Sequence, residues 1–173
     1  THGIKKLNPN LVDYENDEIW NYEQISLGFN FRITDIQAAL GLSQLNKLEK
    51  FVKKRNLIAK KYYQSFQDLP IKTPFVDEEN LSSFHLYTIR IPLKNTYKDR
   101  NSLYKLLLNE RILVNLHYIP VYRHPYYQKM GFQKNYCPEA ELYFKEAMSL
   151  PIFPSLSEKE QDRVIQEITK FFN

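Results

Sequence analysis

Apolar residues recur every three, four or seven positions along the first half of the chain. The stripe consists of Leu42, Leu45, Leu48, Val52, Ala59, Tyr62, Phe66 and Leu69. Such spacing places side chains on one face of a helix. Thr34-Asp35-Ile36-Gln37 matches a capping box, so the helix should begin at Asp35, and Pro70 should close it. The pattern predicts one long helix over 34–69.

The second half alternates between strand-like and helix-like segments. Segments rich in β-branched and aromatic residues, typical of strands, cover 83–92, 111–119 and 150–153. Segments with helical spacing of apolar residues cover 99–110, 138–148 and 158–172, the last opened by a capping box from Ser157 to Glu160. This order predicts an α/β fold in which helices pack on a few-stranded sheet joined to the long helix.

Composition narrows the class of protein without naming a function. The 173 residues are 43% hydrophobic and 25% charged, which is typical of a folded globular chain. Lys and Arg exceed Asp and Glu by 24 to 20, so anionic partners are favoured. Cys137 is the single cysteine, which excludes an intrachain disulfide and favours a reducing, cytoplasmic compartment. No apolar run is long enough for a membrane span or signal peptide.

Several common kinds of site are not indicated. Four glycines are too few and too scattered for a phosphate-binding loop of either the dinucleotide or the P-loop type. The four histidines lack metal-ligand spacing, so we expect no metal. No Gly-x-Ser-x-Gly elbow marks a nucleophile. Seven lysines and arginines opposite the apolar stripe of the long helix are read as its solvated face, so we expect no nucleic-acid partner.

Two groups of residues are candidates for binding. In GFNFRITDIQAALG, Asn30 and Arg32 stand directly before the helix. Because Thr34 and Gln37 already cap the helix, the side chains of Asn30 and Arg32 are not needed for capping and can serve another role. His85 and His117 each lie where a strand-like segment meets a loop or a proline, and Tyr118 begins a tyrosine-rich stretch. A core histidine, or aromatic residues at a subunit interface, would explain the second group equally well.

Four stretches together resemble the DegT/DnrJ/EryC1 family of pyridoxal-phosphate-dependent sugar aminotransferases. They are GFNFRITDIQAALGLSQL, SSFHLYTIRI, LVNLHYIPVY and SLPIFPSLSEKEQDRVI, in the order and spacing of the family's C-terminal half. His2-Gly3-Ile4 is similar to the segment that follows the family's lysine region. Within the family, these sequence stretches are similar to those of the UDP-4-amino-4,6-dideoxy-N-acetyl-β-L-altrosamine transaminases of pseudaminic acid synthesis. One departure is Asn109-Glu110-Arg111, where relatives usually have a glycine.

The resemblance implies the small C-terminal domain of a type I aminotransferase. Residues 1–33 would be the end of the large domain with an interface loop, 34–69 a long linking helix, and 70–173 the small α/β domain. The implied reaction transfers an amino group from glutamate to a UDP-linked 4-keto-6-deoxy sugar. The implied assembly is a homodimer with sites at the subunit interface. The sugar, the ring position and the stereochemistry stay open.

The resemblance also implies roles for individual residues. Asn30 would reach the pyridoxal phosphate of the partner subunit, and Arg32 would face the nucleotide sugar or hold the loop. His85, His117 and Tyr118 would line the substrate entrance. The Schiff-base lysine, the acidic partner of the pyridine nitrogen and the stacking aromatic all precede His2 in the family, so no catalytic residue is assigned here and the 173 residues alone are predicted to be inactive.

Two alternatives stay open at this point. One is a non-catalytic module that binds a partner through the long helix and the tyrosines. The other is a sugar dehydratase that keeps the cofactor but has a histidine in place of the lysine. The residues upstream of Thr1 would decide between the dehydratase and the aminotransferase.

Overall fold

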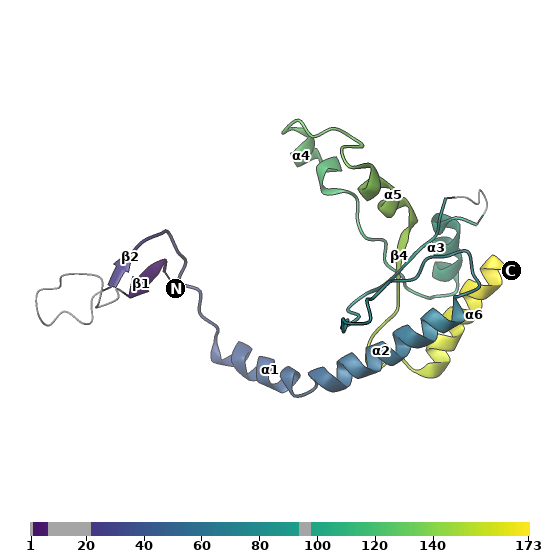
Figure 1. The fold of residues 1–173 in the computed structure, drawn as a ribbon, viewed down its shortest axis with the longest axis horizontal. Helices are drawn as coiled ribbons and strands as arrows, with labels where there is room; N and C mark the ends of the chain where they lie inside the picture. The colour runs from purple at the N-terminus through teal and green to yellow at the C-terminus, as the bar shows by residue number, and fades with distance from the viewer. Residues whose placement is uncertain (1, 7–21, 94–97) are drawn as a thin grey trace, which may run out of the picture. The chain divides into compact units, whose positions relative to one another are not determined.

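The computed structural model describes residues 2–6, 22–93 and 98–173 (Figure 1). Of the segment 1–33, predicted as the end of the large domain with an interface loop, residues 7–21 lie outside the described residues. The described chain forms two compact units, residues 1–46 and residues 47–173. None of the described helices is both long enough and apolar enough to cross a membrane.

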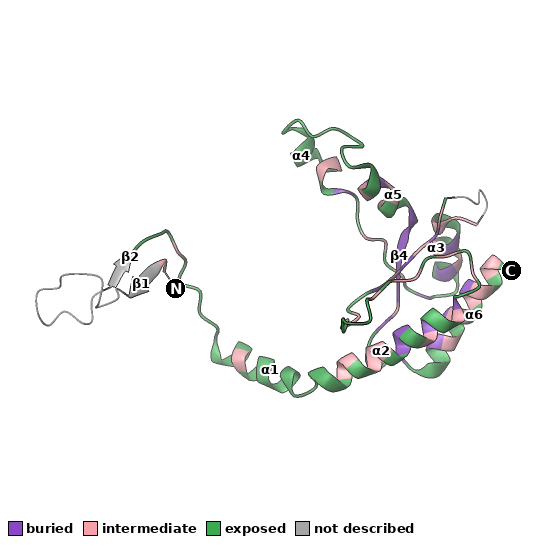
Figure 2. Cartoon of the chain, in the orientation of Figure 1, coloured by how far each residue is buried: buried purple, intermediate pink, exposed green. Residues whose placement is uncertain are grey.

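The described residues of unit one form a pair of strands and one helix. Strands β1 (Ile4–Lys6) and β2 (Tyr22–Gln24) pair antiparallel. Helix α1 (Asp35–Leu45) begins where predicted. The Thr34 Oγ accepts the Gln37 N–H at 3.3 Å, and the Gln37 Oε1 accepts the Thr34 N–H at 2.9 Å. The capping box is therefore confirmed, although α1 buries none of its side chains within this chain (Figure 2).

The helix predicted as continuous over 34–69 is two helices. After α1, Asn46 and Lys47 form a turn, and α2 runs from Leu48–Ser65. Asn46 and Lys47 both keep right-handed helical backbone angles, with ψ of −16° and −8°. The interruption between α1 and α2 is therefore a break in the helical hydrogen-bond pattern rather than a change of backbone angles. Asparagine favours such a place because its amide competes with the helical backbone. At the other end α2 stops at Ser65 rather than Leu69. The three-part division into 1–33, 34–69 and 70–173 stays a prediction.

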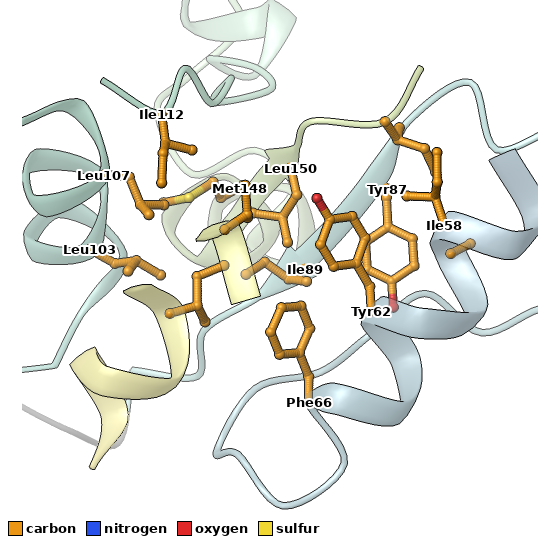
Figure 3. Close-up of a cluster of buried hydrophobic side chains, with 14 of the residues drawn as sticks. Ile58, Tyr62, Phe66, Tyr87, Ile89, Leu103, Leu107, Ile112, Met148 and Leu150 are labelled. Carbon is orange, nitrogen blue, oxygen red and sulfur yellow. The ribbon is translucent and has the colours of Figure 1, made fainter. Parts of the chain in front are cut away.

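Unit two is built on an antiparallel sheet. Strands β3 (Tyr87–Arg90) and β4 (Ala147–Leu150) pair from Tyr87↔Leu150 to Arg90↔Ala147. Single bridges extend the sheet on both sides, from Lys72 to Arg90 and from Asn115 to Ser149. A fully buried core lies between this sheet and the helices (Figure 3). It includes Tyr62, Phe66, Ile89, Leu103, Leu107, Met148 and Ile168.

Helices α2 and α6 (Glu158–Phe172) pack together against the core (Figure 1). The buried Gln161 side chain donates to the Ile58 carbonyl at 2.8 Å, which joins the two helices. The Tyr62 hydroxyl donates to the Pro151 carbonyl at 2.9 Å. Burial raises the pKa of Tyr62 because the phenolate would lose its hydration. The predicted capping box of α6 is confirmed, with the Ser157 Oγ accepting the Glu160 N–H.

Helix α3 (Arg100–Asn109) ends in a motif usually built on glycine. The Ile112 N–H donates to the Leu107 carbonyl at 2.8 Å, and the Arg111 N–H to the Leu108 carbonyl at 2.9 Å. This is the Schellman pattern. Its left-handed position is Arg111, with a φ of 56°. The buried Leu107 and Ile112 side chains supply the apolar contact that accompanies the motif.

The remaining elements are short helices and α5. A 3-10 turn, η1 (Val121–Arg123), leads into α4 (Pro125–Gln128). Helix α5 (Pro138–Glu146) then passes directly into β4. The α/β class is confirmed, because helices α2, α3 and α6 share a buried core with the sheet.

All three strands predicted in the second half differ from the observed ones. The strand over 83–92 is limited to β3, because Phe84 has a φ of 43° and turns the chain. The segment 111–119 is not a strand, since only Asn115 pairs with β4. The extended piece expected at 150–153 begins earlier, at Ala147, and shortens the helix predicted over 138–148. All four β4 residues are buried, so no alternation marks this strand.

Candidate functional site

The loop before α1 presents Asn30 on an exposed stretch. Phe29 and Phe31, on either side, stack on each other with ring centroids 5.2 Å apart. Both rings are mostly exposed. Among the described residues, the Asn30 side chain is exposed and has no hydrogen-bond partner, as expected for a side chain not needed for capping. Its amide is therefore free to donate to a ligand.

Arg32 holds the same loop to the beginning of the chain. Its Nη1 donates to the Phe31 carbonyl at 2.9 Å. Its Nη2 lies 3.1 Å from the Nε2 of His2. Of the two roles expected for Arg32, the contacts within this chain are those of holding the loop. His2 was not among the predicted site residues, although its place in the His2-Gly3-Ile4 motif was the available signal.

Close backbone packing fixes the loop further. A side chain on Gly28 would overlap the backbone of His2 and Gly3, and one on Gly3 would overlap the backbone of Ser26. Gly3 also has a φ of 69°, which glycine adopts without steric cost. The Ile25 N–H donates to the Gly3 carbonyl at 2.9 Å. Both glycines are thus required for the approach of the two segments.

In unit two, His117 and Tyr118 lie together. Their ring centroids are 4.6 Å apart in an edge-to-face arrangement. Both ring nitrogens of His117 are buried and have no hydrogen-bond partner among the described residues. A neutral imidazole carries one donor and one acceptor, and leaving them unpaired in a buried place costs free energy. Tyr118 is 73% exposed beside it.

His85 lies at an exposed bend between Phe84 and β3. Its neighbour Phe84 donates its N–H to the Ser82 Oγ at 3.1 Å, which stabilises the left-handed turn there. Among the described residues, no hydrogen bond or ring contact joins His85 to His117 or Tyr118. The rings of His117 and Tyr118, which are neighbours in the sequence, are in contact. The placement of all three at one substrate entrance stays a prediction.

The loop before α1 offers one hydrogen-bond donor for an anion. The Asn30 amide has no hydrogen-bond partner among the described residues, and an amide N–H can donate to a phosphate oxygen. Conversely, every lysine in residues 47–93 and 98–170 is at least partly exposed. A lysine that serves as nucleophile or base needs a dry pocket that lowers its pKa. The covalent attachment of pyridoxal phosphate is therefore not assigned to any of these lysines. No cluster of three metal-binding side chains occurs among the residues described.

Comparison with known proteins gives a match over nearly all of the chain. The model of the DegT/DnrJ/EryC1/StrS aminotransferase family matches residues 2–169. The spore coat polysaccharide biosynthesis protein SpsC of Bacillus subtilis is 38% identical over 170 residues, which cover 96% of this chain and 43% of that protein. The UDP-4-amino-4,6-dideoxy-N-acetyl-beta-L-altrosamine transaminase of Campylobacter jejuni is 31% identical, over 92% and 40% of the two chains.

Solved structures agree with these sequence matches. Helicobacter pylori PseC, an aminotransferase of pseudoaminic acid biosynthesis, superimposes with a TM-score of 0.76 at 30% identity, covering 99% of this chain and 43% of its own. The putative sugar aminotransferase Spr1654 of Streptococcus pneumoniae gives 0.77 at 28% identity, covering 98% and 40%. Spr1654 has also been solved in pyridoxal phosphate and pyridoxamine phosphate forms. The chain spans about two fifths of the length of these relatives.

Proposed function

Because the chain belongs to the DegT/DnrJ/EryC1/StrS aminotransferase family, we propose that it is the C-terminal part of a nucleotide-sugar aminotransferase. The reaction would transfer an amino group from glutamate to a UDP-linked 4-keto-6-deoxy sugar. Pyridoxal phosphate would supply the chemistry by carrying the amino group between the two substrates. The transaminase from Campylobacter jejuni and PseC from Helicobacter pylori support this choice of substrate.

One observation carries the proposal for this chain's own residues. His117 keeps two buried ring nitrogens without a partner among the described residues, beside the largely exposed Tyr118. A ligand that accepts and donates hydrogen bonds would satisfy the imidazole, and the phenol ring would offer an apolar face and a hydroxyl. A nucleotide sugar carries both kinds of group. We assign His117 and Tyr118 to its binding, with His85 at the same entrance.

Unit one would serve the cofactor. The exposed Asn30 amide would donate to the phosphate of the pyridoxal phosphate bound by the partner subunit. Arg32 would contribute by keeping the loop against His2, as its hydrogen bond to the imidazole does. This arrangement requires a homodimer, in which each loop completes the other subunit's site.

Two measurements test the proposal. Mixing the 173-residue chain with pyridoxal phosphate should give no lysine-dependent absorbance band, and adding glutamate and the keto sugar should give no amino transfer. The same coding sequence expressed with its upstream residues should bind the cofactor and catalyse the transfer. A band that requires a lysine of the 173 residues would contradict the proposal, as would an upstream sequence without a cofactor-binding lysine.

A further inference from the structure

The segment that carries His117 and Tyr118 is held at its two ends. At the first end, Asn115 and Ser149 exchange backbone hydrogen bonds of 3.2 and 2.8 Å. Between the ends, residues 116–119 form no backbone hydrogen bond to any described residue. At the second end come the buried Pro120 and the turn η1. The position of the His117 ring therefore depends on what fixes these ends.

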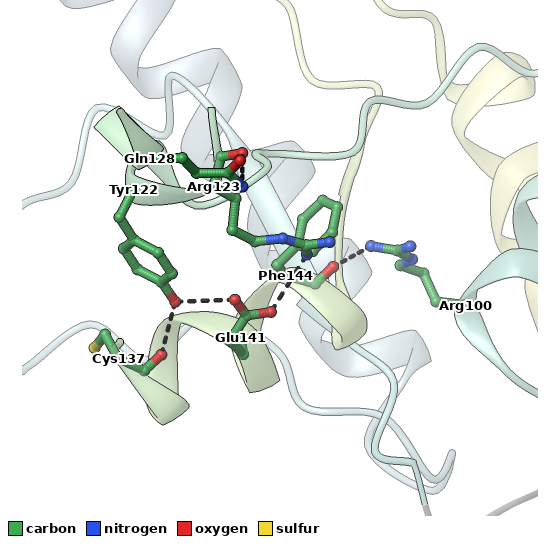
Figure 4. Close-up of polar contacts among 7 residues, drawn as sticks. All are labelled: Arg100, Tyr122, Arg123, Gln128, Cys137, Glu141 and Phe144. Carbon is green, nitrogen blue, oxygen red and sulfur yellow. Dashed lines mark hydrogen bonds and ion pairs between the residues drawn. The ribbon is translucent and has the colours of Figure 1, made fainter. Parts of the chain in front are cut away.

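Glu141 of α5 fixes the second end (Figure 4). Its carboxylate accepts the Tyr122 hydroxyl at 3.1 Å on one oxygen and the Arg123 guanidinium at 3.3 Å on the other. The residue is only 6% exposed. The Tyr122 hydroxyl also lies 3.0 Å from the Cys137 carbonyl, at the beginning of the same helix. Partial desolvation and the adjacent carboxylate raise the pKa of Tyr122.

An aromatic side chain completes the holding of Arg123. The guanidinium lies over the Phe144 ring at 5.5 Å from its centroid, and Arg100 of α3 lies over the same ring at 5.3 Å. Arg100 also donates to the Phe144 carbonyl (Figure 4). These contacts place Arg123 between an aromatic ring and a buried carboxylate, so its orientation is strongly restricted.

Both holding points belong to one continuous stretch of chain. Glu141 lies on α5, and Ser149 lies on β4, which follows α5 without a loop. We propose that Glu141 is a positioning residue: through Tyr122 and Arg123 it sets the place of His117 and Tyr118 relative to the sheet. This inference rests on the proposed function only where it concerns substrate binding.

The chain offers a matched control. Glu146 lies on the same helix, is 5% exposed and pairs with Arg90 at 2.7 Å. Its partner is on β3, and among the described residues no hydrogen bond or ion pair joins either side chain to residues 116–123. Replacing Glu146 should therefore weaken the fold in a comparable way without releasing the segment. Glu141→Gln provides a conservative variant, since its amide can donate to Tyr122 and accept from Arg123.

The test uses the ring-proton NMR signals of His117 and Tyr118 in the 173-residue chain, without any ligand. In Glu141→Leu and Tyr122→Phe these signals should move toward unfolded-peptide values, because the rings lose their fixed edge-to-face geometry. In Glu141→Gln and Glu146→Leu they should stay. If Glu141→Leu does not fold, Tyr122→Phe decides. Unmoved signals in the folded variants, or equal movement in Glu146→Leu, would overturn the inference.

A titration with UDP then separates the inference from the proposed function. If only about a tenth of the Glu141→Leu molecules hold the segment in place, the apparent Kd rises roughly tenfold. Glu146→Leu should bind UDP like the unsubstituted chain. Equal affinities for Glu141→Leu and Glu146→Leu would count against positioning. Failure of the unsubstituted chain to bind UDP would instead contradict the proposed substrate. In that case the NMR signals of the His117 and Tyr118 rings would still test whether Glu141 positions the segment.

Discussion

Gly28 lies with its backbone against the backbone of Gly3, and neither position has room for a side chain. The contact joins segments that are far apart in the sequence and places the Asn30 loop directly after it. The His2 N–H donates to the Phe29 carbonyl at 3.4 Å, and the Gln24 amide donates to the His2 carbonyl at 3.0 Å. The conformation of the loop is thus fixed mainly by backbone contacts with the first turn of the chain.

Substitution Gly28→Ala should separate the two segments. The new methyl group would overlap the Gly3 backbone, so the Ile25 N–H should lose its bond to the Gly3 carbonyl and exchange faster with solvent. Hydrogen exchange followed by NMR measures this amide directly. Gly41→Ala is the matched control, because that helical position has open space around it. It should stabilise α1 by about 0.5–1 kcal/mol. Slow exchange at Ile25 in Gly28→Ala would contradict the prediction.

Replacing Arg111 by glycine should stabilise unit two. Arg111 adopts a left-handed φ of 56° in the Schellman motif, which costs a residue with a side chain more than it costs glycine. Part of the gain is lost because glycine adds freedom to the unfolded chain, so we expect a net gain of about 0.5–1 kcal/mol. Urea unfolding with an unchanged m-value would measure it. Arg111→Ala keeps the strain, and equal stability of the two variants would refute this explanation.

The contribution of Asp99 should depend on pH. Its carboxylate caps α3 by accepting the Ser102 N–H at 2.7 Å, and this bond lowers its pKa in the folded chain. Since the folded pKa is depressed, the stabilisation is present above the unfolded pKa of about 4 and is lost as the pH falls through the folded value. Asp99→Ala should therefore cost about 1 kcal/mol near neutrality and progressively less below about pH 4. Urea unfolding of the two proteins near neutrality and below about pH 4 measures how their difference in stability changes with pH. A stability difference that does not depend on pH would contradict the prediction.

The ion pair between Arg90 and Glu146 should show strong coupling. Both Nε and Nη2 of the guanidinium contact the Glu146 carboxylate, at 3.0 and 2.7 Å. Glu146→Leu leaves Arg90 without its partner and should cost about 2–3 kcal/mol, less than for a fully buried pair because Arg90 is partly exposed. Adding Arg90→Met should recover much of this loss. A double-mutant cycle by chemical denaturation gives the coupling, and additive losses would show that the pair contributes little.

Substitution His117→Phe should separate stability from binding. Because both ring nitrogens lack partners among the described residues, removing them should raise the free energy of unfolding by about 1 kcal/mol. The affinity for UDP should fall at the same time. Thermal unfolding and a UDP titration measure the two effects. A destabilised variant would show instead that the imidazole serves the fold.

Local signals in the sequence predicted much of the fold. The capping boxes at Thr34 and Ser157 depend on residues three apart, so both could be placed without knowing the tertiary structure. Strand β4, which contains Ser149, could not be distinguished from the end of α5 in the sequence. All four of its residues are buried, so no alternation of apolar and polar residues marks it as a strand. Its partner Asn115 pairs at one residue only, which no local pattern reveals.

The candidate site was predictable to a smaller extent. Asn30 stood out by elimination, because the cap of α1 was already supplied by Thr34. The contact of Arg32 with His2 spans 30 residues and depends on the hairpin between them. The burial of Glu141 depends on where η1 returns to α5. Such long-range contacts leave no periodic trace in the sequence.

The direct passage from α5 into β4 also limits how the length of this protein can vary. A residue inserted between Glu146 and Ala147 would turn every following strand residue to the opposite face of the sheet. Met148 would leave the core, and Ser149 would lose its 2.8 Å contact with the Thr88 hydroxyl. Insertions and deletions among homologues should therefore avoid this junction and gather instead in the exposed 129–136 loop.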